Sequence, residues 1–427
     1  MVFSLKSGLL FFVVNCIECI LITLRKIIND KMTNSTKRAL DDLVVLDLSR
    51  VLAGPWCAQL MSDFGAEVIK IERTGVGDDS RGWGPPFVNL SAQERVATYF
   101  CSANRGKKSI ALDIAKAEDR AEILKLVATA DVFVENFKAG SLTRFGLDFD
   151  SLSKLNPRLV YCSITGYGST GPYADRPGYD GVIQGVGGIM SVTGEKDGLP
   201  GAGPQRVGVA LTDVMTGVYA AFGIMTALWE RQRNGVGQKI ELSLLDVQVT
   251  SMATLAASYF ASGVVPTRQG NAHPTIVPSD IFPCKDGAIL ITVGNDSQFK
   301  SLCHAVGLSA FADDVRYATN EARAVNRESL TLALRQCFSD KGRVALTETL
   351  SKAGVPAGLL NDLGQVMEDP QVQHSDLVVK FAMGEAKPIQ VLGNPLKLSR
   401  TPAQYLTPPP KLGEHTEQVL KRSNKKS

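Results

Sequence analysis

The chain has 427 residues, of which 44% are hydrophobic and 21% are charged, and this balance is typical of a soluble globular protein with about two to three domains. A formal net charge of +3 is too small to indicate a nucleic acid or an anionic membrane as a partner. The eight cysteines and four histidines are scattered along the chain, which argues against a disulfide framework or a metal site and favours a reducing compartment. We therefore expect a cytoplasmic protein without a metal, with the mitochondrial matrix as the alternative location.

The first residues are apolar but do not match a standard targeting signal. Residues 8–24 are interrupted by Asn15 and Glu18, and their length is at the lower limit for a membrane span. A clear cleavage site for a signal peptide is missing, and the Arg-rich pattern of a transit peptide fits only weakly. We expect residues 1–40 to be an extension outside the fold, with translation starting at Met32 as one explanation of residues 1–31. A membrane anchor is the alternative.

The next segment has the pattern of a βαβ unit. An apolar strand is expected at residues 43–48, followed by a break at Gly54-Pro55, a helix at 57–66 and a second strand at 67–72. The pattern repeats, with strands expected at 107–112, 131–136 and 159–164 and a helix at 117–130. These repeats predict a parallel sheet. Because ligands of such sheets bind at the carboxyl ends of the strands, the expected site lies near residues 51–55, 73, 112–114, 136–140 and 165–168.

Residues 166–171 match the G-x-G-x-x-G pattern of dinucleotide sites and follow an expected strand. The context does not fit such a site, because Pro172 and Pro177 stand where an apolar helix is required. An acidic residue at the end of a second strand about 20 residues later is also missing. We therefore expect a glycine-rich loop over a different ligand.

Asp213 is the only charged residue in the stretch 208–229, whose length and lack of proline predict a buried helix. It stands where this helix begins, so its carboxylate would meet unpaired backbone N–H groups and the positive end of the helix dipole. An ionised, partly desolvated carboxylate is a credible covalent nucleophile that needs no base to activate it. An ordinary helix cap is the alternative.

Changes in composition suggest further boundaries. A strand is expected at 239–244, and several prolines between residues 266 and 283 precede strands around 289–293. We expect a large domain at 41–244, a linker at 245–262, a smaller α+β domain at 263–317 and a second linker at 318–344. Residues 345–427 would return to complete the large domain.

Several stretches, in order along the chain, resemble family III CoA-transferases. They are residues 47–55, 65–73, 104–109, 131–137, 166–168, the stretch that opens at Asp213, and 412–416. The resemblance covers about residues 43–420. It implies an α/β fold with a Rossmann-like large domain and a smaller α+β domain, and a homodimer whose two subunits are interlocked.

The resemblance also implies a reaction at Asp213. The carboxylate would attack an acyl-CoA thioester to give a mixed anhydride and CoA thiolate, which would then form an aspartyl-CoA thioester and release the first acid. A second carboxylic acid would reverse these steps. The implied reaction needs no metal or redox cofactor, and coenzyme A enters as the thioester substrate.

The family's CoA contacts match Val51, Leu52, Arg73, Leu112, Asn136, Phe137 and Arg144. The two arginines suit the phosphates and the apolar groups suit adenine and the pantetheine arm, and Lys107 and Lys108 could add charge. Two lysines that contact CoA in the family match Ala115 and Pro177, so this chain departs from the family pattern at part of the phosphate site.

A related branch of the family racemises 2-methylacyl-CoA thioesters with a histidine at the position of Tyr179. Tyrosine is a poor base at neutral pH, which favours transfer over racemisation. Residues 81–87, 161–168, 178–180 and 270–273 resemble the dicarboxylate CoA-transferases, which implies succinyl-CoA as donor and an acid such as glutarate as acceptor. Arg105 and His273 are candidates to bind the remote carboxylate, with Tyr179 as a third substrate-binding residue. A CoA-binding subunit without activity is the remaining alternative.

Overall fold

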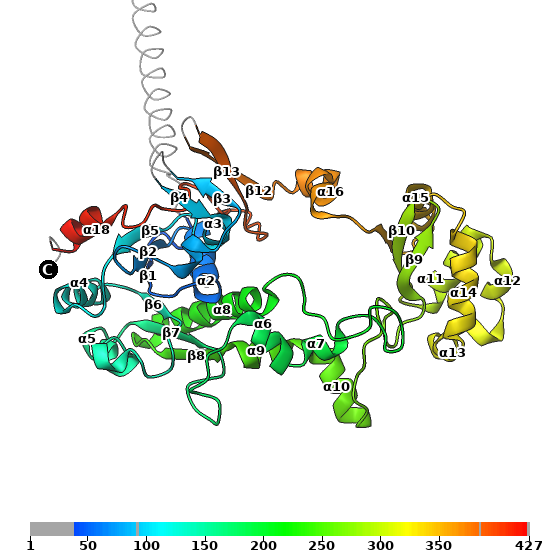
Figure 1. Cartoon of the computed structure of the whole chain (residues 1–427), viewed down its shortest axis with the longest axis horizontal. Coiled ribbons are helices and arrows are strands. Elements are labelled where there is room, and N and C mark those ends of the chain that lie inside the picture. The colour runs from blue at the N-terminus through cyan, green and yellow to red at the C-terminus, as the bar shows by residue number, and fades with distance from the viewer. Residues whose placement is uncertain (1–37, 91–93, 384–385, 425–427) are drawn as a thin grey trace, which may run out of the picture.

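The computed structural model describes residues 38–90, 94–383 and 386–424 (Figure 1). The apolar stretch at 8–24 and the rest of the expected extension up to residue 37 lie outside the described residues. The last three residues of the expected extension contact the fold, since the N–H of Leu40 donates to the carbonyl of Phe64 at 2.9 Å.

A six-stranded parallel sheet forms the centre of the large unit, in the order β5-β2-β1-β6-β7-β8. The strands are β1 (Val44–Asp47), β2 (Glu67–Glu72), β5 (Lys108–Ala111), β6 (Val132–Glu135), β7 (Val160–Thr165) and β8 (Lys239–Ser243). The α/β class and the parallel sheet expected from the sequence are confirmed.

Helices cover both faces of this sheet because alternate strand residues point to opposite sides. Val45, Val132 and Val160 face α2 (Ala53–Asp63) and α8 (Leu211–Asn234). Leu46 and Phe133 face the side that is covered by α4 (Ala117–Val127), α5 (Phe149–Leu155) and α18 (Thr416–Ser423). The core of the large unit is therefore two apolar layers, one on each side of the sheet.

The α8 helix packs closely on α2 but is not buried on all sides. A Cβ added to Gly217 would lie 2.7 Å from the carbonyl oxygen of Ala53, so glycine permits this close approach. The opposite face of α8 exposes large apolar side chains, including Phe222 at 71% and Trp229 at 61%. The expectation of a buried helix is therefore wrong for one face, because an apolar residue does not record which side is covered. Among the described residues, α8 is the one helix long and apolar enough to cross a membrane by length and composition, and 44% of its apolar 18-residue window is buried inside the fold.

A second, smaller unit is built on an antiparallel sheet of β9 (Ser279–Cys284), β10 (Gly287–Thr292) and β11 (Ala357–Leu359). Its helices are α11 (Asp296–Val306), α12 (Ser309–Ala312), α13 (Asn320–Val325), α14 (Arg327–Phe338) and α15 (Arg343–Lys352). Leu330, Leu334 and Phe338 recur at helical spacing on α14 and are buried in this core. Residues 318–344, expected as a linker, thus belong to the small unit. Residues 345–359, expected to return to the large domain, also belong to the small unit, because α15 packs in its core and β11 pairs with β10.

Two connections join the units (Figure 1). One follows α9 (Leu244–Ser251) and carries α10 (Ala253–Ser262), and the other carries α16 (Leu363–Glu368) and α17 (Pro370–His374). After the second connection, β12 (Val378–Met383) and β13 (Ala386–Leu392) pack beside β3 (Phe87–Asn89), β4 (Arg95–Ala97) and α3 (Thr98–Ala103). The N–H of His415, just before α18, donates to the carbonyl of Ser109 at 2.9 Å, so the end of the chain is fixed to the large unit.

Candidate active site

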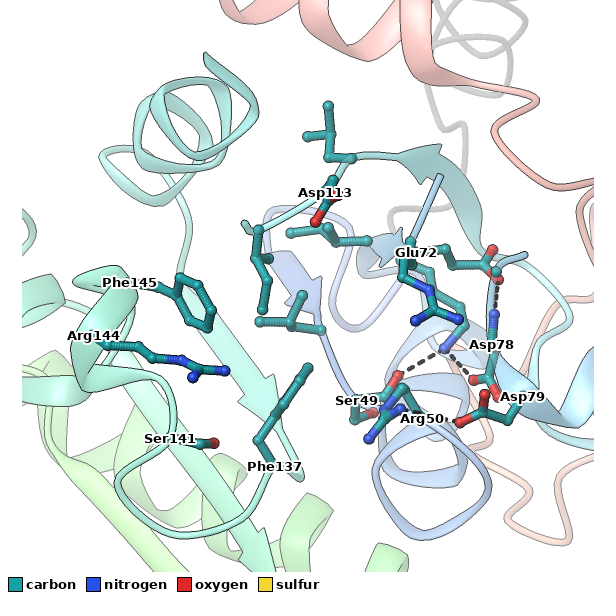
Figure 2. Close-up of a pocket in the computed structure, with 17 residues that line it drawn as sticks. Ser49, Arg50, Glu72, Asp78, Asp79, Asp113, Phe137, Ser141, Arg144 and Phe145 are labelled. Atoms are coloured by element: carbon teal, nitrogen blue, oxygen red, sulfur yellow. Dashed lines mark hydrogen bonds and ion pairs between the residues drawn. The ribbon is translucent and has the colours of Figure 1, made fainter. Parts of the chain in front are cut away.

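A cavity of about 250 Å³ opens at the carboxyl ends of the strands of the large sheet, among Arg73, Leu112, Phe137 and Arg144 (Figure 2). Arg144 belongs to a 3-10 helix, η2 (Thr143–Phe145), and its side chain reaches toward the cavity between Phe145 and Phe137. Apolar surface and the guanidinium groups of three arginines, Arg50, Arg73 and Arg144, thus border the same space.

A second cavity of about 430 Å³ adjoins the first and reaches α8. Val51, Leu52, Asn136, Tyr179 and Asp213 line it. The two cavities share Arg50, Asp79 and Phe137, so they are adjacent parts of one groove. The seven residues expected to contact CoA line this groove together with Asp213 and Tyr179.

The loop between β1 and α2 is held in an uncommon conformation beside this groove. Val51 has φ of 70°, in the left-handed region that a β-branched residue rarely adopts. Asn136 accepts the N–H of Arg50 at 2.8 Å and donates to its carbonyl at 2.7 Å, while the N–H of Val51 donates to Asp78 at 3.2 Å. Asn136 therefore shapes the wall of the groove by holding the loop.

A buried network of charged side chains holds the loop between β1 and α2 in place. Lys70 lies 2.9 Å from Asp78 and also donates to the carbonyl of Ser49 at 2.9 Å (Figure 2). Burial alone would raise the pKa of Asp78, but the Lys70 ammonium and the hydrogen bonds from Ser80 hold it well below its usual value. Asp78 stays ionised and keeps both contacts.

The two lysines considered as extra charge for the ligand are engaged elsewhere. Lys107 is buried and donates to Asp47 at 2.8 Å and to the carbonyl of Pro55 at 2.8 Å. Burial lowers the pKa of Lys107 to about 8, although the Asp47 carboxylate opposes this shift. Lys108 pairs with Glu67 at 2.6 Å. Neither lysine lines the groove, so their expected contribution is wrong.

Asp213 is the third residue of α8, is 8% exposed and faces the second cavity. Within the described residues, its carboxylate forms no hydrogen bond or ion pair. Burial and the nearby Asp180 carboxylate raise the pKa of Asp213 to about 7. The sequence suggested unpaired N–H groups here, but Asp180 accepts the N–H groups of Thr212 at 2.9 Å and Asp213 at 3.3 Å. The carboxylate is thus sheltered from water and less acidic than an exposed aspartate.

Arg105 does not line the groove, and the structure contradicts a role for it in substrate binding. Its side chain is buried, and Nε and Nη2 donate to Asp63 at 2.8 and 2.6 Å. Its Nη1 donates to the carbonyl of Leu392 at 2.7 Å. The guanidinium group is committed to protein contacts because it must compensate a buried carboxylate.

His273 lies in the segment before β9 of the small unit and lines neither cavity of the groove. Its Nδ1 accepts the N–H groups of Thr275 at 3.1 Å and Ile276 at 3.0 Å. Arg327 donates to its backbone carbonyl at 2.9 Å. Within a single described chain, His273 therefore does not line the cavity that Asp213 faces.

Three basic residues that the sequence did not single out line the second cavity: Arg50, Lys138 and Arg176. Arg50 pairs with Asp79 at 3.1 Å, and Lys138 pairs with Asp175 at 3.0 Å. Arg176 stacks on Tyr173, with its guanidinium carbon 3.8 Å from the ring centre. All three adjoin residues already considered, since Arg50 precedes Val51, Lys138 follows Phe137 and Arg176 precedes Pro177, and that adjacency was the available signal.

Comparison with known proteins agrees with the arrangement of the groove. The model of CoA-transferase family III matches residues 40–416. Succinate–glutarate CoA-transferase of Agrobacterium fabrum is 46% identical over 390 residues, covering 90% of this chain and 95% of that protein. Succinyl-CoA:glutarate CoA-transferase of Mus musculus is 41% identical over 384 residues, covering 90% of this chain and 86% of that protein.

A solved structure has the same fold. A CAIB/BAIF family protein from Brucella suis superposes with a TM-score of 0.81 at 44% identity, covering 91% of this chain and 100% of that protein. The fold, the groove and these similarities lead to one conclusion: the chain belongs to CoA-transferase family III.

Proposed function

We propose that this protein transfers CoA from succinyl-CoA to a dicarboxylic acid such as glutarate. The names of the Agrobacterium fabrum and Mus musculus relatives support this pair of acids. The observation that carries the proposal is the position of Asp213, which is sheltered at the end of the groove that the expected CoA contacts line.

In the proposed reaction, a carboxylate oxygen of Asp213 attacks the thioester carbon of succinyl-CoA, and the C–S bond breaks. This step forms a succinyl-aspartyl anhydride and CoA thiolate. The thiolate then attacks the aspartyl carbonyl and releases succinate, leaving an aspartyl-CoA thioester. The carboxylate of glutarate attacks that thioester, and the returning thiolate completes glutaryl-CoA and frees Asp213.

The groove supports the proposed binding of coenzyme A. Arg73 and Arg144 offer guanidinium groups for phosphates, and Phe137 offers an apolar surface. Lys138 and Arg176 supply positive charge near Pro177, where the family lysine is missing. Tyr179 is 60% exposed in the second cavity and can donate its hydroxyl to the incoming acid. Because CoA moves between carboxylates, we propose that no metal or redox cofactor takes part.

We further propose that the active form is an interlocked homodimer. The exposed apolar face of α8 supports a covering partner, since contiguous apolar surface of this kind marks interfaces. Two long connections between the units support an arrangement in which a second chain passes between them (Figure 1). The described cysteines are free thiols, which supports a reducing compartment, and we propose the cytoplasm with the mitochondrial matrix as the alternative.

The test is transfer by the purified protein. Incubation with succinyl-CoA and a panel of carboxylic acids should give glutaryl-CoA and succinate, detected by mass spectrometry. If no dicarboxylate accepts CoA, the proposed substrate class is wrong. Hydroxylamine added during turnover should convert Asp213 to a hydroxamate, and Asp213→Asn should give neither transfer nor hydroxamate. Transfer by the folded Asp213→Asn variant would exclude the proposed nucleophile.

A further inference from the structure

The first turn of α8 is capped by a carboxylate that comes from a different helix. Asp180 is the first residue of α6 (Asp180–Val186), and its Oδ2 accepts the N–H groups of Thr212 and Asp213. Ala210 stands at the N-cap position of α8 and makes no side-chain cap. Asp180 therefore does what an N-cap side chain normally does, but from outside the helix.

Asp180 is itself held in place. Its Oδ1 accepts a hydrogen bond from Gln184 at 2.8 Å, and the Gln184 side chain is fully buried. Gln184 also accepts the N–H of Val207 at 2.9 Å and donates to the carbonyl of Val209 at 3.3 Å. These contacts fix the segment before α8 against α6, so the Asp180 carboxylate has a defined position beside Asp213.

The capping has a chemical consequence for Asp213. Free N–H groups at the start of a helix stabilise a nearby anion, and here two of those groups already bind another anion. A second negative charge close to Asp213 also disfavours its ionised form. Both effects make the Asp213 carboxylate more basic than a carboxylate at an uncapped helix start.

We infer that Asp180 is a positioning residue that holds the first turn of α8 in place and keeps the Asp213 carboxylate basic, and hence more nucleophilic. The inference rests on the proposed function, in which Asp213 attacks the thioester. A more basic carboxylate donates its electron pair more readily, so the same geometry gives a faster first step at a pH where Asp213 is ionised.

The surroundings of Asp213 agree with this assignment. Burial, together with the charges of Asp213, Asp180 and Asp78, raises the pKa of Tyr99 to about 12, so Tyr99 stays neutral and adds no charge. Tyr99 does not line the second cavity. Besides Asp213, the charged or titratable groups that line it are Asp79 and Asp175, each paired with a cation, and Arg50, Lys138, Arg176 and Tyr179. Asp180 is the carboxylate that bonds the backbone of Asp213 itself.

The test measures how readily Asp213 ionises without requiring turnover. An N-alkyl isoxazolium salt reacts with ionised carboxylates, and peptide mass spectrometry locates the modified residue. In the original protein, labelling of Asp213 should rise with pH through a midpoint near the pKa of about 7. In Asp180→Asn, which keeps the size of the side chain and one acceptor, the midpoint should fall by about one pH unit. An unchanged midpoint in folded Asp180→Asn would overturn the inference.

Two further variants distinguish the effect of the Asp180 charge on Asp213 from an effect of packing in the first turn of α8. Thr212→Val removes the hydroxyl that donates to Gln248 at 2.6 Å in the same turn, leaves the Asp180 charge in place, and should keep the labelling midpoint of the original protein. An equal shift in Thr212→Val would assign the effect to packing and overturn the inference. Asp180→Ser can still accept an N–H without a charge and repeats the test if Asp180→Asn does not fold.

Kinetics then distinguish this inference from the proposed function. If the original protein transfers CoA, the acid limb of its kcat/KM profile should shift downward in Asp180→Asn, in parallel with the labelling midpoint. If Asp180 had only a structural role, Asp180→Asn would lower kcat/KM at every pH without shifting the pH midpoint of the acid limb. If the original protein transfers no CoA, the proposed function fails, while the labelling midpoints still decide the role of Asp180.

Discussion

The guanidinium group of Arg105 forms a two-point ion pair with the carboxylate of Asp63, with Nε and Nη2 at 2.8 and 2.6 Å from its two oxygens. Both side chains are buried, and a third nitrogen of Arg105 donates to the carbonyl of Leu392 in β13. The pair therefore fastens the returning part of the chain to α2.

Arg105→Ala should destabilise the protein because it leaves Asp63 buried without its cation. We expect a loss of about 3–5 kcal/mol in the free energy of unfolding, measured by urea titration. Arg105→Lys should lose less, since it keeps the charge but not the two-point geometry. If Arg105→Ala instead raised KM for the dicarboxylate and left stability unchanged, Arg105 would have to bind the substrate.

Asp213→Asn should make the protein more stable at alkaline pH. The pKa of Asp213 is about 7 in the folded protein against an ordinary 3.8, so the folded state binds the proton more tightly than the unfolded state. Stability is therefore lost as pH rises from about 4 to 7, and the cost of the charge is complete above pH 7. Asparagine avoids this cost, and the gain should be on the order of 2 to 4 kcal/mol at pH 8.

The pH dependence provides the control for this variant. Thermal unfolding of both proteins should converge below about pH 4, where Asp213 is neutral in both the folded and the unfolded state. A difference that is the same at pH 4 and pH 8 would show that packing, and not charge, causes it.

Arg73→Ala and Arg144→Ala should each weaken acyl-CoA binding. A charged hydrogen bond contributes about 1.5–3 kcal/mol, so we expect roughly a 10- to 100-fold rise in Kd, measured by calorimetry. The salt dependence of binding should also decrease. Arg335→Ala is the matched control, because Arg335 lies on α14 of the small unit and should leave Kd unchanged.

Asn136→Ala should impair CoA binding without removing a large contact area. Both polar atoms of the Asn136 amide bond the backbone of Arg50, so the variant frees the loop that contains Val51. We expect a rise in KM for acyl-CoA with a smaller change in kcat. Asn136→Asp keeps the acceptor and loses the donor, so its KM should lie between that of the unsubstituted protein and that of Asn136→Ala. Equal KM values in these three proteins would contradict the role of Asn136 in holding the loop.

Phe222→Glu combined with Trp229→Glu should disrupt the proposed dimer. Both side chains are largely exposed on the outer face of α8, and a buried carboxylate at an interface is costly. Sedimentation should show a smaller or unassembled species. Leu332→Glu is the control, since Leu332 is 59% exposed on α14 and should not affect assembly. An unchanged dimer in the double variant would place the interface elsewhere.

The sequence was informative where a local pattern determines the structure. Short apolar strands that alternate with helices predict a parallel sheet, and the end of each strand then predicts where ligands gather. For this reason Arg73, Leu112 and Asn136 could be assigned to one groove although they are far apart in sequence. Asp213 could be placed at a helix start because its surroundings lack any other charge.

The sequence was uninformative where a partner far along the chain decides the role. Arg105 and Lys107 were expected to bind ligands, but their carboxylate partners in the fold, Asp63 and Asp47, lie 42 and 60 residues away in the chain. The cap of α8 could not be foreseen either, because Asp180 belongs to another helix. An apolar stretch such as α8 also does not reveal that only one of its faces packs inside its own chain.

The backbone of the chain forms a loop that leaves the large unit, passes through the small unit and closes where the returning segment docks, from the bond between Arg105 and Leu392 to the bond between His415 and Ser109. The segment that closes the loop therefore follows both units in the order of synthesis. If two copies are to be linked through one another, the second polypeptide must already lie across the opening when the tail docks. Newly made chains would therefore have to meet while their C-terminal segments are still undocked, and the yield of linked pairs would depend on how closely together in time and place they are synthesised.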